Sequence, residues 1–318
     1  MLKEYPFNTY GFKQIRVIDD TDCACEGDDA FALAHILMTS KFDVRAITAA
    51  QYMYDPDSVE KSHKAVQELV KVMGLQETVP ILCGSSPMKA ENEFVRSEAS
   101  DFIVEEAHRD DPRPLFVVCQ GAITSLAVAL KTDPSIAPKI QCIWIGGAAY
   151  PEGGWEFNLL GDVIAARTVM ESQVPLWQVP QNVYAMMRVS FMTIYNRLKN
   201  CGELGKYLYT KLWEAHGRMI KMSETYEIQD VHNTPVDGTK YTGFACGEAW
   251  VLGDSPVVGL MLNCQEADRD CIGAPYIRDD GSYELRPDNP RKIYVYRSID
   301  SYFILEDFFE KIQFQFSI

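Results

Sequence analysis

The sequence predicts an α/β protein whose mostly parallel central sheet is flanked by helices. The first half of the chain alternates short apolar runs with amphipathic stretches of helical length, and no internal repeat or low-complexity linker interrupts this pattern. Such alternation is typical of βαβ units. With 318 residues, 47% of them hydrophobic, the chain is long enough to bury a large core. We expect a single domain over residues 1–318, with a helical lid inserted at roughly 190–250.

The expected elements follow the apolar periodicity along the chain. Strands are predicted at residues 14–19, 44–50, 78–82, 115–120, 140–146 and 292–296. Helices are predicted at residues 28–39, 57–73, 98–109, 123–131, 162–172, 190–222, 255–263 and 298–312. A loop is predicted between the helix at 255–263 and the strand at 292–296. Ligands of parallel sheets bind beyond the carboxyl ends of the strands, so we expect the chemistry there.

The charge balance restricts the partners. The formal net charge is −15 and the sequence pI is about 4.8. Because a surface this acidic repels nucleic acids and anionic membranes, we expect a small-molecule substrate or a divalent cation instead. No apolar stretch is long enough for a transmembrane helix and the first residues given form no apolar run, so we expect neither a membrane span nor a signal peptide. Nine cysteines, an odd number without a C-x-x-C pair, indicate reduced thiols and a cytoplasmic protein.

The strongest functional signal is the run IRVIDDTDCACEGDDAFALAHIL. An apolar strand ends at Asp19, and five more carboxylates follow within ten residues, namely Asp20, Asp22, Glu26, Asp28 and Asp29. Clustered carboxylates raise one another's pKa, which is costly unless a cation neutralises them. Hard cations such as Ca²⁺ take six to eight oxygen ligands at about 2.3–2.6 Å, so the cluster on this strand-to-helix loop suits a cation of this kind. The alternative is that the paired aspartates only cap the helix.

Two other motifs place carboxylates after a strand. An EF-hand loop starting at Asp20 would need Gly and Glu where the chain has Cys25 and Phe31, so the spacing excludes it. A haloacid-dehalogenase-like phosphatase would use D-x-D, here Asp20 and Asp22. It normally has Thr or Val where this chain has Ala24, and it makes no use of the paired aspartates. The phosphatase is the alternative prediction.

The acidic run resembles the N-terminal signature D-x-D-x-x-x-D-D of the inosine-uridine preferring nucleoside hydrolase family. Five residues separate Asp22 from Asp28, where familiar members have three. The chain is more similar to a longer-looped branch with a glutamate, here Glu26, shortly before the paired aspartates. Three further segments resemble the family in the same order, and the likeness spans most of residues 14–312: LFVVCQGAITSLAVALKTDPSI, IWIGGAAYPEGGWEFNLLGDVIAA and LGDSPVVGLML.

The resemblance implies a metal site and a reaction. Ca²⁺ would be held by the side chains of Asp22, Asp29 and Asp254 and by the backbone carbonyl of Thr124. In the family the cation lowers the pKa of a bound water, and an aspartate, here Asp22, takes its proton as general base. The implied reaction is calcium-dependent hydrolysis of the N-glycosidic bond of a nucleoside or related N-riboside. Without this context, Thr124 and Asp254 could each be a helix cap.

The resemblance also implies how ribose is bound. Its 2′ and 3′ hydroxyls would meet the cation, Asp28 and Asn158, and its 5′ hydroxyl would face Glu156. Asp20 and Glu26 would support the site from nearby. Hydrogen bonds to charged acceptors contribute about 1.5–3 kcal/mol each, so a ribose lacking these hydroxyls should react poorly. Relatives form dimers or tetramers, which implies a homo-oligomer.

The half of the site that would face the base departs from the family pattern. Members that cleave purine or pyrimidine nucleosides often have a histidine before the last metal aspartate as leaving-group acid, and this chain has Gly253. The early substrate asparagine is absent from AAQYMYDP. Aromatic stacking or a loop histidine would then assist the departing base, and the available residues are Tyr52, Tyr54, Trp155, Tyr226 and His232. A riboside-binding protein without turnover is a further alternative.

Overall fold

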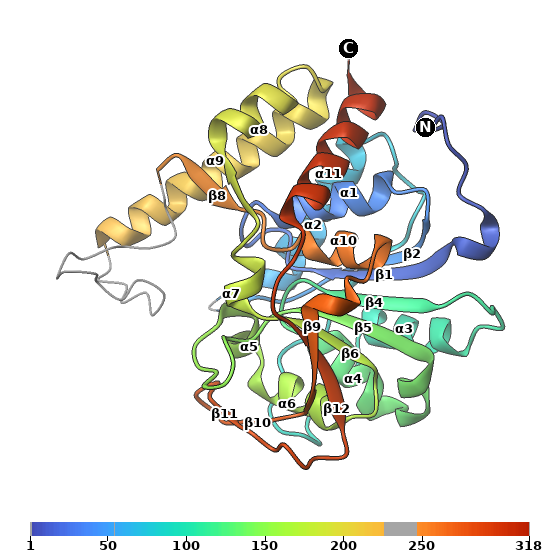
Figure 1. Cartoon of the computed structure of the whole chain (residues 1–318), viewed down its shortest axis with the longest axis vertical. Helices are drawn as coiled ribbons and strands as arrows, with labels where there is room; N and C mark the ends of the chain where they lie inside the picture. Colours follow the sequence, from blue (N-terminus) through green and yellow to red (C-terminus); the bar gives the residue numbers. More distant parts are fainter. Residues whose placement is uncertain (1, 54, 226–246, 318) are drawn as a thin grey trace.

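The centre of the protein is an eight-stranded sheet, seen in a computed structural model that describes residues 2–53, 55–225 and 247–317 (Figure 1). The strands lie in the order β3 (Ile81–Cys83), β2 (Phe42–Ala49), β1 (Ile15–Thr21), β4 (Leu115–Cys119), β5 (Ile140–Ile145), β6 (Leu176–Val179), β12 (Lys292–Tyr296) and β9 (Arg269–Gly273). β9 is antiparallel to β12, and the other neighbouring pairs are parallel. The predicted fold class is confirmed.

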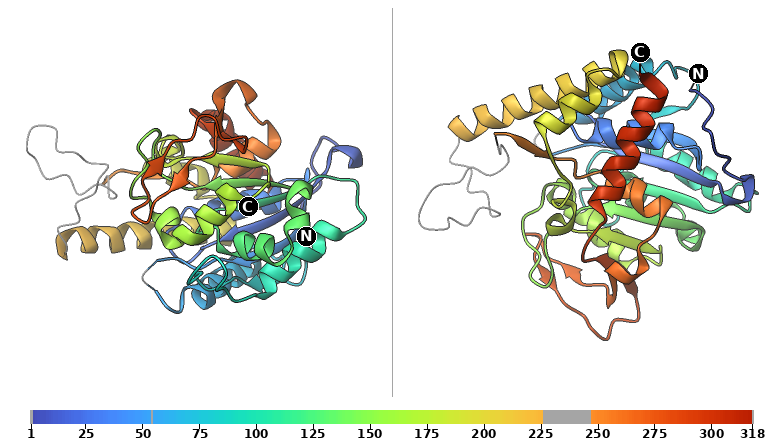
Figure 2. Two further views of the ribbon diagram at one scale, coloured as in Figure 1. Left: turned by 90° about the horizontal axis from the view of Figure 1, so that it is seen from below. Right: turned by 45° about the horizontal axis from the view of Figure 1, so that its top comes forward.

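Helices cover both faces of the sheet (Figures 1 and 2). One hydrophobic cluster joins the sheet to α1 (Asp29–Met38), α2 (Ser58–Val72), α8 (Phe191–Leu198), α9 (Gly202–Thr225), α10 (Pro256–Leu262) and α11 (Ser301–Phe316). A second cluster joins it to α3 (Glu98–His108), α4 (Thr124–Thr132) and α6 (Val163–Glu171). Val17 of β1 belongs to the first cluster and Ile18 to the second, so this central strand is buried on both faces.

Short elements complete the carboxyl edge of the sheet and the periphery. They are the helices α5 (Phe157–Gly161) and α7 (Gln181–Tyr184) and two antiparallel ribbons, β7 (Arg188–Ser190) with β8 (Ala249–Val251) and β10 (Tyr276–Ile277) with β11 (Tyr283–Glu284). α9 extends beyond the sheet (Figure 1). Three residues considered for the base side, Tyr54, Tyr226 and His232, lie outside the described residues. Among the helices that are described, none has both the length and the apolar character to cross a membrane.

Two strands of the sheet lie where the sequence pattern predicts none. β6 has only four residues between Pro175 and Pro180, too short a run for periodicity to reveal. β9 falls in the predicted loop, and as an edge strand it exposes Asp270 and Cys271 and lacks an apolar signal. The long helix predicted at 190–222 is two helices, because the chain turns at Gly202 with a φ of 55°. The other predicted elements lie within a few residues of their expected bounds.

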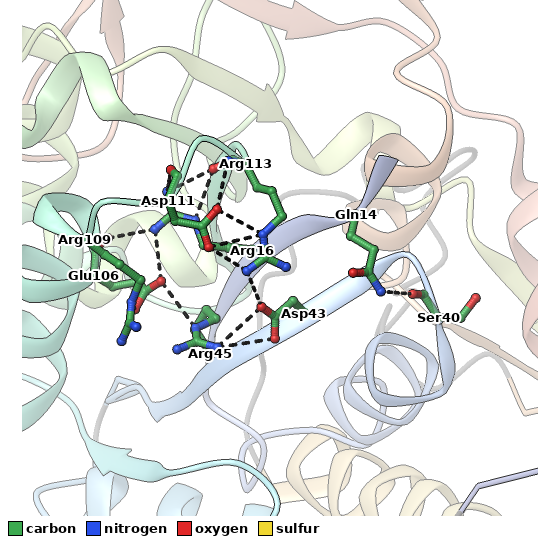
Figure 3. Close-up of polar contacts among 9 residues, drawn as sticks. All are labelled: Gln14, Arg16, Ser40, Asp43, Arg45, Glu106, Arg109, Asp111 and Arg113. Atoms are coloured by element: carbon green, nitrogen blue, oxygen red, sulfur yellow. Dashed lines mark hydrogen bonds and ion pairs between the residues drawn. The ribbon is translucent and has the colours of Figure 1, made fainter. Parts of the chain in front are cut away.

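A network of ion pairs ties the beginning of β1 to α3, at the opposite end of the strand from the acidic run. The guanidinium of Arg16, which is 4% exposed, donates to the carboxylate of Glu106 at 3.0 Å and to its backbone carbonyl at 2.9 Å. Arg45 and Arg109 also pair with Glu106, and Asp111 lies on the other side of Arg16 (Figure 3). Glu106 therefore neutralises a cation that is almost fully removed from water.

Replacing Glu106 with alanine is expected to lower the free energy of unfolding by about 3–5 kcal/mol, because buried Arg16 would lose its nearest carboxylate and keep only Asp111 at 3.9 Å. Urea unfolding followed by circular dichroism measures this loss. The control is Glu105→Ala in the same helix, where the side chain is exposed and the expected change is below about 0.5 kcal/mol. Equal effects of the two substitutions would contradict the assignment.

A buried histidine joins α1 to α11 and gives the fold a pH dependence. His35 Nε2 lies 2.7 Å from the carboxylate of Asp307, which Lys311 also contacts. Burial lowers the pKa of His35 from 6.5 to about 4, against the opposing effect of Asp307. The neutral imidazole is thus favoured in the folded state, and its contribution is present above pH 6.5 and is lost as the pH falls through 4.

The unfolding free energy of wild type relative to His35→Gln should therefore fall by about 3 kcal/mol between pH 7 and pH 4. Denaturant unfolding of both proteins across this range measures the difference, in which contributions common to both cancel. A difference independent of pH would show that His35 is as easily protonated in the folded chain as in the unfolded one.

Candidate active site

The candidate site lies at the carboxyl end of β1, between β2 and β4. Asp20 accepts a hydrogen bond from Thr48 Oγ1 of β2 at 2.5 Å. Asp19 accepts one from the amide of Gln120, the residue that follows β4. Burial raises the pKa of both carboxyls, that of Asp20 to about 7. These two acids link the three central strands directly beneath the acidic loop.

Three further carboxylates lie close together at the start of α1 and before α10. Asp28 and Asp29 at the start of α1 and Asp254 before α10 are buried, and each offers an oxygen within 4.8 Å of the others. Asp28 Oδ2 accepts the backbone N–H of Gly253 at 2.9 Å, and Asp29 Oδ1 accepts Thr21 Oγ1 at 2.6 Å. Burial raises the pKa of all three carboxyls. The fold thus brings the two distant acidic segments of the chain together.

Helix capping does not explain Asp28 or Asp254. Asp28 occupies the N-cap position of α1, but its side chain makes no capping hydrogen bond. The N-cap of α10 is Ser255, one residue after Asp254. Asp162 does cap a helix, because its side chain accepts the N–H of Ala165 in α6.

Asp22 lies on the loop that follows β1, and its carboxyl is next to that of Asp29, the first residue of α1. Its side chain is 4% exposed, and its pKa is raised well above the usual value by burial and then by the charge of Asp29. Gly121 makes room for it, since a Cβ atom at that position would stand 3.0 Å from Asp22 Cγ. A larger residue at 121 would therefore displace the Asp22 carboxyl.

Thr124 is the first residue of α4, and Ile123 rather than Thr124 is the N-cap. Its hydroxyl donates to Asp162 Oδ2 at 2.9 Å and accepts the amide of Gln51 at 3.3 Å. Gln51 also donates to the carbonyl of Gly161 at 3.0 Å. A buried glutamine and an aspartate thus fix the hydroxyl side of Thr124. Gln51 was not singled out from the sequence, although it stands in the AAQYMYDP segment that lacks the expected asparagine.

Asn158 is fixed through its amide nitrogen. Nδ2 donates to the carbonyls of Gln120 at 3.0 Å and Ile145 at 2.9 Å, at the ends of β4 and β5. Both N–H groups are used in this way, which leaves Oδ1 as the atom of the side chain that can accept a hydroxyl. The two strand ends therefore set where that oxygen lies.

Glu156, which is fully buried, holds four donors. Its Oε1 accepts the N–H of Asn158 at 3.2 Å and the hydroxyl of Tyr184 at 2.9 Å. Its Oε2 accepts the N–H of Gly147 at 2.7 Å and that of Leu159 at 2.8 Å. Two hydrogen bonds occupy both lone pairs of a carboxylate oxygen. Glu156 is therefore the N-cap of α5, and its predicted contact with the ribose 5′ hydroxyl stays a prediction.

The long loop between Asp22 and Asp28 packs against α9. Arg218 of α9 donates to the carbonyl of Cys25 at 3.3 Å, and a Cβ atom at Gly27 would come within 2.9 Å of Leu212 Cα. Burial and the charge of Asp29 raise the pKa of Glu26 to about 7, and Arg218 opposes that shift. The loop thus connects the acidic cluster to the helix predicted as part of the lid.

Two features concern the half of the site that the resemblance assigns to the base. A Cβ atom at Gly253 would stand 3.1 Å from Tyr184 Cδ2 and 3.3 Å from Asp28 Oδ2, so the ring of Tyr184 restricts any side chain at this position. An open groove of about 610 Å³, lined in part by Gln51 and Tyr52, lies next to the residues that hold Thr124. Its size is within the range of small-molecule sites. Trp155 packs edge-on against Phe157 instead.

Comparison with known sequences places the chain in a family. The family described as inosine-uridine preferring nucleoside hydrolase matches residues 17–272. The pyrimidine-specific ribonucleoside hydrolase RihA of Citrobacter koseri is 26% identical over 181 residues, which are 49% of this chain and 57% of that protein. RihA of Salmonella arizonae is 27% identical over 177 residues with the same coverage. The chain therefore matches little more than half the length of these relatives.

Solved structures show the same fold. A plant nucleoside hydrolase, the PpNRh1 enzyme, has a TM-score of 0.72 at 19% identity and covers 94% of this chain and 98% of its own. A purine-preferring ribonucleoside hydrolase from Gardnerella vaginalis has a TM-score of 0.69 at 19% identity and covers 93% and 98%. The family match, which extends over most of the chain and includes the acidic run, decides the assignment: the chain belongs to the inosine-uridine preferring nucleoside hydrolase family.

Proposed function

We propose that this protein hydrolyses the N-glycosidic bond of a nucleoside or related N-riboside, with Ca²⁺ as its cofactor. The observation that carries the proposal is the buried meeting of Asp28, Asp29 and Asp254 at the carboxyl edge of the sheet. Family membership and the similarity to RihA support the reaction type. They also disfavour the phosphatase alternative, which would leave this cluster without a function.

The donor set fits a hard divalent cation. Burial has the largest effect on the pKa of Asp254 and raises it. The negative charges of other carboxylates raise this pKa further, and those of Asp28 and Asp29 contribute most. A cation bound among them would remove this repulsion. We assign Asp22, Asp29, Asp254 and the Thr124 carbonyl as its protein ligands. When bound, it would lower the pKa of the attacking water and hold the ribose hydroxyls.

The protein's own side chains would accept the proton of the attacking water and bind the ribose. Asp22 would accept the proton of the attacking water, as a general base next to Asp29. Asp28 and Asn158 Oδ1 would accept hydrogen bonds from the ribose hydroxyls, whose orientation stabilises the oxocarbenium-like state. Asp20 and Glu26 would support these groups from the strand below and from the long loop. The burial of Asp20 excludes water that would otherwise screen its charge.

The departing base has no histidine at position 253 to protonate it. Tyr52, which lines the groove, offers an aromatic face for stacking. The glycine also favours the second candidate function, a protein that binds ribosides and does not cleave them. Substrates with a leaving group that needs no acid would be cleaved best.

The proposal is tested by incubating the protein with purine, pyrimidine and modified nucleosides and with nucleotides, with Ca²⁺ and with EDTA. Release of reducing sugar from nucleosides, abolished by EDTA, is the expected result. Release of phosphate from nucleotides without reducing sugar would support the phosphatase. Calorimetric binding of nucleosides with no sugar release would support the binding protein.

We further propose that the protein acts in the cytoplasm as a dimer or tetramer. The cysteines of the described residues are all free thiols, in keeping with a reducing compartment. Light scattering coupled to size-exclusion chromatography tests the oligomeric state, and a monomer at micromolar concentration would refute it.

A further inference from the structure

We propose that the open groove beside Thr124 binds the leaving group of the riboside, and that the side-chain oxygen of Gln51 selects leaving groups that offer an N–H donor. This inference rests on the proposed function and extends it to the substrate class. Gln51 is a specificity-determining residue in it, which accepts a hydrogen bond from the leaving group and takes no part in proton transfer. Ribosides of N-methylated bases, which lack that N–H, would then bind poorly.

The side chain of Gln51 is fixed through its nitrogen. It is 3% exposed, and Nε2 donates to the carbonyl of Gly161 at 3.0 Å and to Thr124 Oγ1 at 3.3 Å. Because a carbonyl can only accept, Gly161 requires the nitrogen on its side, and this sets which way the amide is turned. Both N–H groups are used in these two contacts. The oxygen Oε1 is left for other partners.

This oxygen is an acceptor that the protein does not fill. Among the residues that the structure describes, none donates a hydrogen bond to Gln51 Oε1, and Gln51 is part of the groove lining. An amide oxygen has two lone pairs, and leaving a buried acceptor unpaired is costly. An N–H of a ligand in the groove would pair with Oε1, whereas a methyl group in its place would leave the oxygen without a partner.

The groove adjoins the proposed cleavage site through two consecutive residues. Gln51 contacts the hydroxyl of Thr124, whose carbonyl is a proposed metal ligand. Tyr52 lies near the proposed general base, because burial and then the charge of Asp55 raise the pKa of its hydroxyl, and the charge of Asp22 adds to this shift. A leaving group in the groove would thus lie beside the groups proposed to hold the water and the ribose.

The rest of the lining suits a mostly apolar group. The groove holds about 610 Å³, a volume in the range of small-molecule sites. Asp55, a charged acceptor in the lining, is already occupied by Lys61 at 2.6 Å and by the hydroxyl of Tyr52 at 3.3 Å. Gln51 thus adds a buried, unoccupied acceptor to a wall of apolar side chains, which are Met53, Pro56, Val59, Pro87, Leu160 and Val163.

The experiment compares uridine with 3-methyluridine, which lacks the N3–H, and with 5-methyluridine, which carries the added methyl on carbon and keeps the N–H. Ribose release gives kcat and KM, and calorimetry gives the affinity. In wild type, 3-methylation should raise KM at least about tenfold and leave kcat within about threefold, because this hydrogen bond forms in the ground state as well as in the transition state. 5-Methyluridine should match uridine within about threefold in both. Inosine and 1-methylinosine form the corresponding purine pair.

Gln51→Met removes the acceptor and keeps a side chain of similar size. The difference in KM between uridine and 3-methyluridine should then fall to within about threefold, because neither can pair at this position. A change in Thr124 would affect both substrates alike and cancel in this ratio. Gln141→Met is the matched control, since the Gln141 amide also donates to two carbonyls, those of Cys142 and Pro175, near the start of β5. It should keep the full difference.

Equal KM values within both pairs in wild type would overturn the inference, and this comparison needs no variant. A 3-methyl penalty that persists in Gln51→Met would overturn the assignment to Gln51 and point to another acceptor in the groove, such as Ser86. An equal loss with 5-methyluridine would show that the groove excludes bulk and does not recognise the N–H. If wild type releases no sugar from any riboside, the proposed function fails, and the calorimetric affinities of the same nucleosides still decide whether the N–H is recognised. Absence of any binding would overturn both.

Discussion

Replacing Asp22 with alanine is expected to lower kcat for nucleoside hydrolysis by about 10³-fold or more. A general base contributes about 10²–10⁴-fold to such a reaction, and Asp22 is also proposed as a metal ligand, so the substitution removes two functions. The carboxyl is buried, and burial and then the charge of Asp29 raise its pKa well above the usual value. Initial rates of ribose release at saturating nucleoside and Ca²⁺ measure the effect.

Asp22→Asn separates the two functions. The amide keeps an oxygen for the cation and loses the ability to accept a proton, so metal binding should weaken less than kcat falls. The matched control is Asp101→Ala on α3, an exposed carboxylate that is paired with Arg96 and is not part of the acidic cluster, which should leave kcat unchanged. Retention of full turnover by Asp22→Ala would refute the general-base assignment and would move the search for the base to Asp28 or Asp29.

The acidic cluster could largely be predicted from the sequence, because most of its residues lie in one short segment. Asp20, Asp22, Asp28 and Asp29 stand in one strand-to-helix segment, and the strand position of the first two follows from the apolar run before them. The parallel order of the strands then brings the end of this segment next to other strand ends. Asp254 is the exception, since only the resemblance connected it to the cluster.

The ribose and base side could not be predicted in the same way. The four hydrogen bonds of Glu156 come from Gly147, Asn158, Leu159 and Tyr184, which no periodicity or motif places around one carboxylate. Tyr184 has no sequence signal, because its contact with Gly253 arises only when α7 and the turn before α10 fold together. A family resemblance predicts which residue types occur at a site. The number of hydrogen bonds that a carboxylate accepts depends on the folded structure, which the resemblance does not give. The capping of α5 by Glu156 and its contact with Tyr184 were therefore not predicted from the sequence.

The second large effect is expected from metal removal. Chelation should abolish turnover and lower the melting temperature, because the buried charges of Asp28, Asp29 and Asp254 would then repel one another without a counter-ion. Ca²⁺ at a hundred times its Kd stabilises a protein by about 2.7 kcal/mol. For a chain of this size, that corresponds to a rise of about 5 °C in the melting temperature. Differential scanning fluorimetry against Ca²⁺ and Mg²⁺ concentration measures it.

Asp254→Asn tests this prediction most directly, because the substitution should change the melting temperature in opposite directions without and with Ca²⁺. Without a cation it removes one of the repelling charges and should raise the melting temperature. With Ca²⁺ it removes a ligand and should shrink the ion-induced rise, so the order of wild type and variant reverses between the two conditions. Asp288→Asn, at an exposed position, changes the net charge by the same amount and should show no reversal. If Ca²⁺ raised the melting temperature of wild type and of Asp254→Asn equally, Asp254 would not be a ligand of the cation. A bound cation would then not explain why the three carboxylates are buried together.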